Sequence, residues 1–320
     1  MDTVGLFRQN FPDLELSFNY PLTDKNYFKL GGRAEVFYSA RSKQEAISLA
    51  IFCKQQGIKL TILGGGSNVI IADEGLSGLV LQLAFRELTF ISENEQSLTL
   101  QADAGIKTSA LVARAAAKNA TGLEGFIGVP GVLGGAIYNN AHYLGFLIGD
   151  YITQVEVFDV KKEETVVFTR EKCQFAYEKS IFQSEKDLII FSAYFELKKA
   201  YPDLIKSNLQ SAISERERTQ PLAQPSCGCV FQNPPNTEAL RELFPQFKER
   251  DFIPAGFLID QAGLKGLREG DIQVSEKHAA FFINLGQGQA SQVKTLIAKV
   301  KASVLAKFNV ILEEEVFYLS

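Results

Sequence analysis

Two cysteines separated by one glycine stand in the stretch SCGCVFQNP, residues 226–234, and their thiols could do chemistry. One intervening residue is fewer than the two of a zinc knuckle, and the chain has only two histidines, so no metal site is predicted. A thiol has a reference pKa of about 8.5, far below that of an alcohol, so Cys229 can donate a proton. A buried thiol that only packs is the commonest fate of a free cysteine, and the stretch alone leaves both interpretations open.

Two glycine-rich segments could bind an anion through their backbone N–H groups. LGGGSN, residues 63–68, adds donors from Ser67 and Asn68, although a tight hairpin turn is an alternative. GLEGFIGVPGVLGGAIYNNA, residues 122–141, follows a predicted helix, and so much glycine costs entropy unless a ligand approaches the backbone closely. The first segment does not fit a Rossmann fingerprint, because a strand follows it, or a P-loop, because it has no lysine. The pair suits a dinucleotide whose diphosphate lies between the two segments.

The bulk composition excludes several classes of protein. The chain has 320 residues and a net charge of −4, so it lacks the basic surface that is typical of a nucleic-acid binder. No apolar run approaches the roughly 20 residues that span a bilayer, and the start lacks the pattern of a secretory signal. The four cysteines show no disulfide framework. We therefore expect a cytoplasmic protein without membrane insertion, with two or three domains.

Alternating helices and strands must position these segments. Residues 42–57 predict a helix, because Ser42 can cap it, Glu45 follows three residues later and Gly57 can end it. A buried strand, IKLTIL, then leads into the first glycine segment, and VIIA after that segment predicts another strand.

Beyond residue 80, short strands separated by polar turns predict an α+β architecture. The expected strands are LVLQL, LTFI, SLTLQAD, QVEVFDV, ETVVF and LIIFSAYFEL, with an alanine-rich helix, KTSALVARAAAKNA, among them. A connecting helix is expected over residues 207–220. Further helices are expected near 237–244, 254–263 and 290–307, with a strand at 280–285 and a closing strand, NVILEEEVFYLS. On that strand Glu313 and Glu315 would share one face.

The two glycine segments resemble the flavin-binding half of the UDP-N-acetylenolpyruvoylglucosamine reductase family, which has a vanillyl-alcohol-oxidase-like FAD fold. The similarity continues, in order, over about residues 25–316. It is carried by NYFKLGGRAEVFY, FAYEKSIF, QPLAQPSCGCVFQNP, AGFLIDQAGLKGLREGDIQVSEKHAAFFIN and LEEEV.

The resemblance implies two small α+β domains that bind FAD, residues 1–80 and 81–206, and an α+β substrate domain, residues 207–312. The strand 313–320 would return to the first domain. It further implies an oxidoreductase, UDP-N-acetylmuramate dehydrogenase, that uses NADPH to make a peptidoglycan precursor from a nucleotide-sugar substrate, with no obligate protein partner. The alternatives are a flavin oxidase or dehydrogenase of the same fold, and a weakened paralogue that binds without turnover.

The resemblance also assigns residues to the site. Cys229 would donate the proton where the family has serine, and Glu315 would be the catalytic carboxylate, with a raised pKa. Glu178 stands at a catalytic position where the family has arginine, which reverses a charge that Lys179 or Lys277 would have to offset. His142 receives no role. FAD would contact Leu63, Gly64, Gly65, Gly66, Ser67, Asn68, Gly128, Pro130, Gly131, Gly134, Gly135, Ala136 and Asn140. The substrate would contact Tyr177, Lys179, Arg218, Asn233 and Lys277.

Overall fold

The computed structural model describes residues 2–143 and 145–320, and the chain divides into two compact units. The first unit comprises Met1–Tyr20, Ala34–Gly65 and Ser77–Arg216, and the second comprises Pro21–Arg33, Gly66–Leu76 and Glu217–Ser320. Helices and mixed sheets occur together, which confirms the predicted α+β class. The division into three domains remains a proposal.

One sheet of the first unit contains the parallel strands that lead to the first glycine segment. Its order is β1 (Ser17–Pro21), β2 (Arg33–Ala40), β5 (Leu76–Leu83) and β3 (Leu60–Leu63), and β3 runs parallel to β5. The unit begins with helix α1 (Thr3–Asn10), and α2 (Lys43–Gln56) connects β2 to β3.

Helix α2 forms where the sequence predicts it. Ser42 Oγ accepts a hydrogen bond from Glu45 N at 3.2 Å, and Gly57 follows the helix in the left-handed conformation, with φ +63°. The side chains of Leu49 and Cys53 on its inner face are buried. Local capping signals therefore determine both ends of this helix.

We expect Ser42→Ala to lower the free energy of unfolding of the first unit by about 1 kcal/mol, because Glu45 N loses its side-chain acceptor. Denaturant titration followed by circular dichroism measures the change. Ser211→Ala, at an exposed position on α5 (Pro202–Thr219), is the matched control and should not reduce stability. Equal stability of Ser42→Ala and the wild type would contradict the assigned cap.

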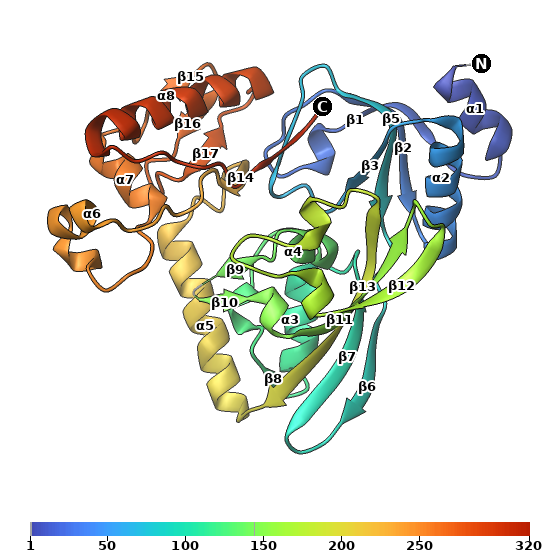
Figure 1. Ribbon diagram of the computed structural model, residues 1–320, viewed down its shortest axis with the longest axis horizontal. Helices are drawn as coiled ribbons and strands as arrows, with labels where there is room; N and C mark the ends of the chain where they lie inside the picture. Colours follow the sequence, from blue (N-terminus) through green and yellow to red (C-terminus); the bar gives the residue numbers. More distant parts are fainter. Residues whose placement is uncertain (1, 144) are drawn as a thin grey trace. The chain divides into compact units, whose positions relative to one another are not determined.

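A second, six-stranded sheet completes the first unit. Its main order is β12 (Glu164–Thr169), β11 (Ile152–Asp159), β13 (Leu188–Lys199), β7 (Ser97–Asp103) and β6 (Leu88–Glu93), and β8 (Ala120–Thr121) also pairs with β13. Helices α3 (Thr108–Ala116) and α4 (Leu133–Tyr138) lie beside this sheet (Figure 1) and contribute buried leucine and isoleucine to its core. The hairpin β9 (His142–Tyr143) and β10 (Phe146–Leu147) follows α4.

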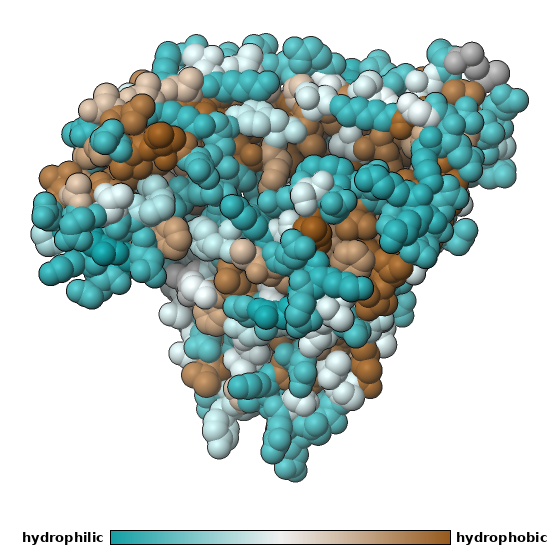
Figure 2. Space-filling model, viewed as in Figure 1, coloured by the Kyte–Doolittle hydropathy of each residue, from teal (hydrophilic) through white to brown (hydrophobic). Residues whose placement is uncertain are grey.

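The second unit packs its helices on a four-stranded sheet. The strand order is β14 (Ser226–Cys229), β17 (Phe281–Asn284), β16 (Ile272–Val274) and β15 (Arg268–Glu269). Its helices are α6 (Glu238–Leu243), α7 (Ala255–Gln261) and α8 (Ala290–Phe308), and β4 (Val69–Ile71) pairs in parallel with β18 (Phe317–Leu319). On the face shown in Figure 2, hydrophobic residues gather where Figure 1 places α7 and α8, and Leu305 of α8 is exposed.

Short 3-10 helices occupy several connections. They are Thr23–Lys25, Glu124–Phe126, Ile148–Asp150, Glu171–Cys173, Ile181–Gln183 and Pro245–Phe247.

Three elements differ from the sequence prediction. Helix α5 begins at Pro202 rather than at residue 207, because proline fits the first turn of a helix. The second glycine segment is not only a loop, since α4 forms within it. The closing strand covers Phe317–Leu319 alone. The proline sets the start of α5. The other two differences depend on contacts with other parts of the folded chain.

Candidate active site

Residues 63–65 of the first glycine segment lie against the second glycine segment in the first unit. A Cβ atom added to Gly65 would lie 2.5 Å from Gly131 Cα, so only glycine allows this approach. At Gly64 the nearest atoms to an added Cβ are Val132 Cγ2 at 3.4 Å and Gly135 Cα at 3.7 Å. Gly135 is exposed, and outside α4 no atom of the described residues lies within 4 Å of a Cβ added there. The segments thus form one backbone-lined surface that is open at Gly135.

The first glycine segment is not a hairpin turn. The strand before it, β3, pairs with β5, whereas the strand after it, β4, pairs with β18. The hairpin alternative is therefore wrong, and the segment connects strands of two different sheets. Gly64 O accepts a hydrogen bond from Gln82 Nε2 at 3.0 Å, which fixes the end of β3 to β5.

The turn after β7 holds the second glycine segment in place. Gly134 N donates to Ala104 O at 2.8 Å, and Leu133 N donates to Ile106 O at 2.9 Å. Gly131 has φ +110°, a conformation that disfavours other residues. The start of α4 is thereby fixed by backbone hydrogen bonds.

The remaining residues predicted for FAD differ in exposure. Gly128 is exposed, and its added Cβ would lie 3.4 Å from Arg216 Nε. Asn140 is buried, and its amide donates to Ala176 O at 2.6 Å and accepts from Gly149 N at 2.9 Å. Asn140 therefore holds neighbouring backbone together. Of the others in the first unit, Leu63 and Ala136 are buried, and Pro130 is half-buried.

The second unit brings Cys229, Glu315 and Asn68 together. Glu315 N donates to Val230 O at 2.8 Å, and Asn68 Nδ2 donates to Glu315 O at 3.2 Å. Phe317 N in turn donates to Asn68 O at 3.1 Å. Three segments that are far apart in the sequence meet at this point, and two residues predicted as catalytic are neighbours through the Val230 bond.

The strand predicted through Glu313 and Glu315 forms only later, at Phe317–Leu319. Glu314 makes an isolated antiparallel bridge with Phe231, and the backbone bonds on either side of it join Glu313 to Gln232 and Glu315 to Val230. The Glu314 carboxylate is not simply solvated, since it contacts Lys301 Nζ and the Tyr318 hydroxyl. The position of Glu315 thus depends on long-range contacts.

The two cysteines of β14 have different environments. Gly228 between them has φ +81°, and the pairing with β17 is irregular between Ser226 and Cys229. Cys227 is buried, and burial raises the pKa of its thiol, as does the charge of Glu315. Cys229 is only partly buried. Cys229 is therefore the thiol of this pair that a ligand can reach.

A cluster in the first unit joins two predicted residues to one that the sequence analysis left without a role. His142 Nε2 lies 3.1 Å from the Tyr177 hydroxyl, and His142 Nδ1 lies 3.6 Å from Glu178 Oε1. The side chain of Glu178 is 1% exposed, so this carboxylate points into the protein. The three residues are titratable and in contact, although 35 residues separate His142 from Tyr177.

The other residues predicted to contact the substrate lie at the surface or form hydrogen bonds with backbone groups. The Lys277 ammonium group donates to Glu217 O. Asn233 Oδ1 accepts from Ala255 N at 2.9 Å at the start of α7. Two further predicted residues are exposed, namely Lys179 and Arg218.

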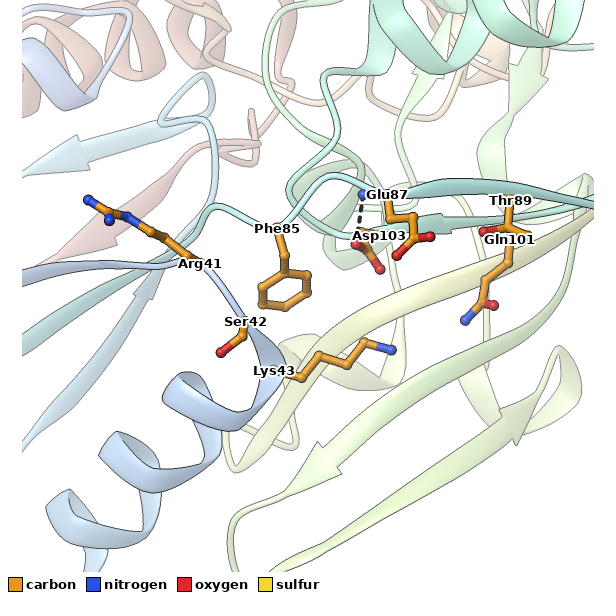
Figure 3. A pocket seen from close by; sticks show the side chains of 8 residues that line it. All are labelled: Arg41, Ser42, Lys43, Phe85, Glu87, Thr89, Gln101 and Asp103. Carbon is orange, nitrogen blue, oxygen red and sulfur yellow. Dashed lines mark hydrogen bonds between the residues drawn. The ribbon is translucent and has the colours of Figure 1, made fainter. Parts of the chain in front are cut away.

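Sequence reasoning missed a polar pocket of 490 Å³ in the first unit (Figure 3). It is lined by Arg41, Ser42, Lys43, Phe85, Glu87, Thr89, Gln101 and Asp103. The lining comes from three separate segments, so no local motif marks it. Glu87 N donates to Asp103 Oδ2 at 2.8 Å, and burial raises the pKa of Asp103. Cations and carboxylates both line the pocket, so it has no clear preference for an anion.

No helix in the described part of the chain has the length and apolar character needed to cross a bilayer. Within the same residues, no three His, Cys, Asp or Glu side chains are arranged to hold a metal ion.

Known proteins resemble this chain over 96% of its length. Residues 34–169 match the family model of an FAD binding domain, and residues 220–319 match that of the UDP-N-acetylenolpyruvoylglucosamine reductase C-terminal domain. The chain is 34% identical to the UDP-N-acetylenolpyruvoylglucosamine reductase of Lactococcus lactis subsp. cremoris (strain MG1363), over 96% of both chains. It is 36% identical to that of Listeria monocytogenes serotype 4a (strain HCC23), over 96% of this chain and 95% of the relative.

One solved structure is similar to 96% of this chain. The crystal structure of the UDP-N-acetylenolpyruvylglucosamine reductase from Thermus caldophilus has a TM-score of 0.73 and 28% sequence identity. The similarity covers 96% of this chain and 99% of that chain.

Proposed function

Because the chain belongs to the UDP-N-acetylenolpyruvoylglucosamine reductase family, we propose that it reduces UDP-N-acetylenolpyruvoylglucosamine to UDP-N-acetylmuramate with FAD as its cofactor. It is thus an oxidoreductase that makes a peptidoglycan precursor. NADPH as the source of hydride, the nucleotide-sugar as substrate and a cytoplasmic location are parts of this proposal. The proposed domains are residues 1–80, 81–206 and 207–312, with residues 313–320 assigned to the first.

The residues of the glycine segments fit a bound FAD. The surface around Gly64 and Gly135 has room for ligand atoms close to the backbone, where N–H groups can bind a diphosphate. Asn68 Oδ1 is buried and accepts no hydrogen bond within the described residues, so it can accept one from a ligand. When bound, FAD supplies the hydride that the substrate receives.

The reaction needs a proton donor and a group that tolerates negative charge. Adding hydride to an enol ether that carries a carboxylate builds negative charge on that carboxylate, and the adjacent carbon must then be protonated. We assign the proton to the partly buried Cys229 thiol. We assign Glu315 as the neighbouring carboxylic acid, which the bond to Val230 O holds beside Cys229.

Tyr177 is the proposed substrate contact in the first unit, and Lys179, Arg218, Asn233 and Lys277 are further proposed contacts. A like charge at Glu178 would oppose an anionic substrate by several kcal/mol, about 2–5. The structure places His142, rather than Lys179, against that carboxylate. The similarity to reductases of this family over 96% of the chain is the observation that favours the reductase.

Anaerobic titration of the purified protein tests the proposed function. We expect visible flavin absorbance, its loss on adding NADPH, and its return on adding UDP-N-acetylenolpyruvoylglucosamine, with one product formed per flavin. Absorbance that does not return would favour the paralogue that binds without turnover. Return of the absorbance only with another reducible compound, or its loss only with another oxidisable compound, would favour a different flavin enzyme. A protein that takes up no FAD would overturn the proposal.

A further inference from the structure

The pocket of Figure 3 lies between the start of α2 and one face of the six-stranded sheet. Successive side chains of a strand point to opposite faces of its sheet, and Leu100 and Ala102 of β7 belong to the hydrophobic core. Gln101 and Asp103 of the same strand therefore point to the other face, where both line the pocket. The sheet thus has a polar face at this place, and the pocket is built on it.

Two carboxylates stand together on one side of this pocket. Glu87 N donates to Asp103 Oδ2 at 2.8 Å, and Asp103 N donates to Glu87 O at 2.9 Å, so the backbone holds the two residues side by side. Asp103 is only 9% exposed, and within the described residues nothing donates a hydrogen bond to its Oδ1. A buried carboxylate oxygen of this kind favours a cationic group as its partner.

Positive groups stand at the start of α2. The Lys43 ammonium group pairs with the Glu156 carboxylate, which also accepts from Ser192 Oγ at 2.6 Å. This pair holds the ammonium group over the sheet, and an ammonium group has three donors, so it can bind a second acceptor. The N–H groups of Lys43 and Gln44 are the first two of α2, and they have no acceptor within the helix. The positive end of the helix dipole also favours an anion here.

The two kinds of charge are close to each other. Burial raises the pKa of Asp103, and the charge of Lys43 acts against that rise. In Figure 3 the Phe85 ring lies between the start of α2 and the two carboxylates. A small ligand that carries both charges and an apolar group can therefore contact all three parts of the lining.

We propose that this pocket binds a zwitterionic α-amino acid, with its ammonium group at Glu87 and Asp103 and its carboxylate at Lys43 and the start of α2. An anion alone would meet the two carboxylates, and a cation alone would meet Lys43 and Arg41, and like charges in contact are costly. A neutral sugar would form only hydrogen bonds without a charge of its own, which are weaker than those between charged groups.

This inference is independent of the proposed function. None of the residues that line the pocket belongs to a glycine segment or is assigned to the substrate. The volume of 490 Å³ lies in the range of small-molecule sites, about 300–1,000 Å³, and leaves room for a side chain beside the two charged groups. We expect an apolar side chain to pack on the Phe85 ring, so L-leucine is the probe.

Isothermal titration calorimetry of the full-length protein with L-leucine tests the proposal. N-acetyl-L-leucine lacks the ammonium group and L-leucinamide lacks the carboxylate, so we expect each to bind about tenfold more weakly or worse. Glucose is the neutral control and should not bind. The proposal is overturned if L-leucine does not bind, if either derivative binds as tightly as L-leucine, or if glucose binds in its place.

Two variants show which group recognises which charge. Glu87→Gln changes an exposed residue, and we expect it to weaken L-leucine and L-leucinamide about tenfold and to leave N-acetyl-L-leucine unchanged. Lys43→Gln should weaken L-leucine and N-acetyl-L-leucine but not L-leucinamide. Glu95→Gln removes the same charge at an exposed position between β6 and β7, outside the pocket, and should bind L-leucine as the wild type does.

The Glu87 variant decides the outcome if Lys43→Gln, which also leaves Glu156 without its cation, does not fold. Wild-type affinity for L-leucine in Glu87→Gln, or an equal loss in Glu95→Gln, would show that the ligand does not bind at this pocket.

Discussion

Gly135→Ala is expected to weaken FAD binding by about tenfold or more, or about 1.4 kcal/mol, without destabilising the protein. Apart from its chain neighbours and the backbone of α4 itself, no atom of the described residues lies within 4 Å of the added methyl group, so the group enters the space that we assign to the ligand. Alanine is also a better helix former than glycine, and residue 135 lies in α4. The melting temperature of the apoprotein should therefore stay equal or rise. Fluorescence titration with FAD measures the affinity.

Gly65→Ala provides the matched comparison. Its methyl group would lie 2.5 Å from Gly131 Cα, so the two segments must move apart. We expect this variant to lose FAD affinity and stability together. If Gly135→Ala binds FAD as tightly as the wild type, the ligand does not approach this part of α4, and the proposed FAD surface is wrong.

Cys229→Ala is expected to slow the substrate half-reaction by about 10²–10⁴-fold, because the proposed proton donor is lost. The half-reaction with NADPH needs no proton from Cys229 and should keep its rate, so it serves as the control within the same variant. Stopped-flow absorbance measures both rates. Cys229→Ser should restore part of the substrate rate, since a hydroxyl can also donate a proton.

An unchanged substrate rate in Cys229→Ala would remove Cys229 as the donor. Cys227→Ala separates the effect of losing a thiol from that of losing the donor, because Cys227 is buried in the core of the second unit. It should reduce stability, since it leaves a cavity, rather than remove proton transfer selectively.

Local signals in the sequence predict much of the fold. Helix α2 is an example, because its start at Ser42 and its end at Gly57 depend on residues within the helix and next to it. The sequence argument also paired the two glycine segments, and Gly65 lies against Gly131, whereas a ligand between the segments remains a proposal. In both cases the chemistry of a few adjacent residues carries the information.

The remainder depends on partners that are distant in the sequence. The closing strand is short because residues 313–316 bond to Val230 and Asn68, which no periodicity in that segment indicates. His142 received no role because its contact with Glu178 arises only when the β9 segment folds onto residues 176–179. The pocket of Figure 3 likewise combines three segments, and its lining has no common motif.

The bond between Asn68 and Glu315 spans 247 residues of sequence. During translation, the first partner therefore leaves the ribosome long before the second exists. A nascent chain can form β3 and the glycine segments early. Glu315, the residue beside the Cys229 turn, is absent until residues 313–319 are synthesised. Contacts of such long range also slow folding.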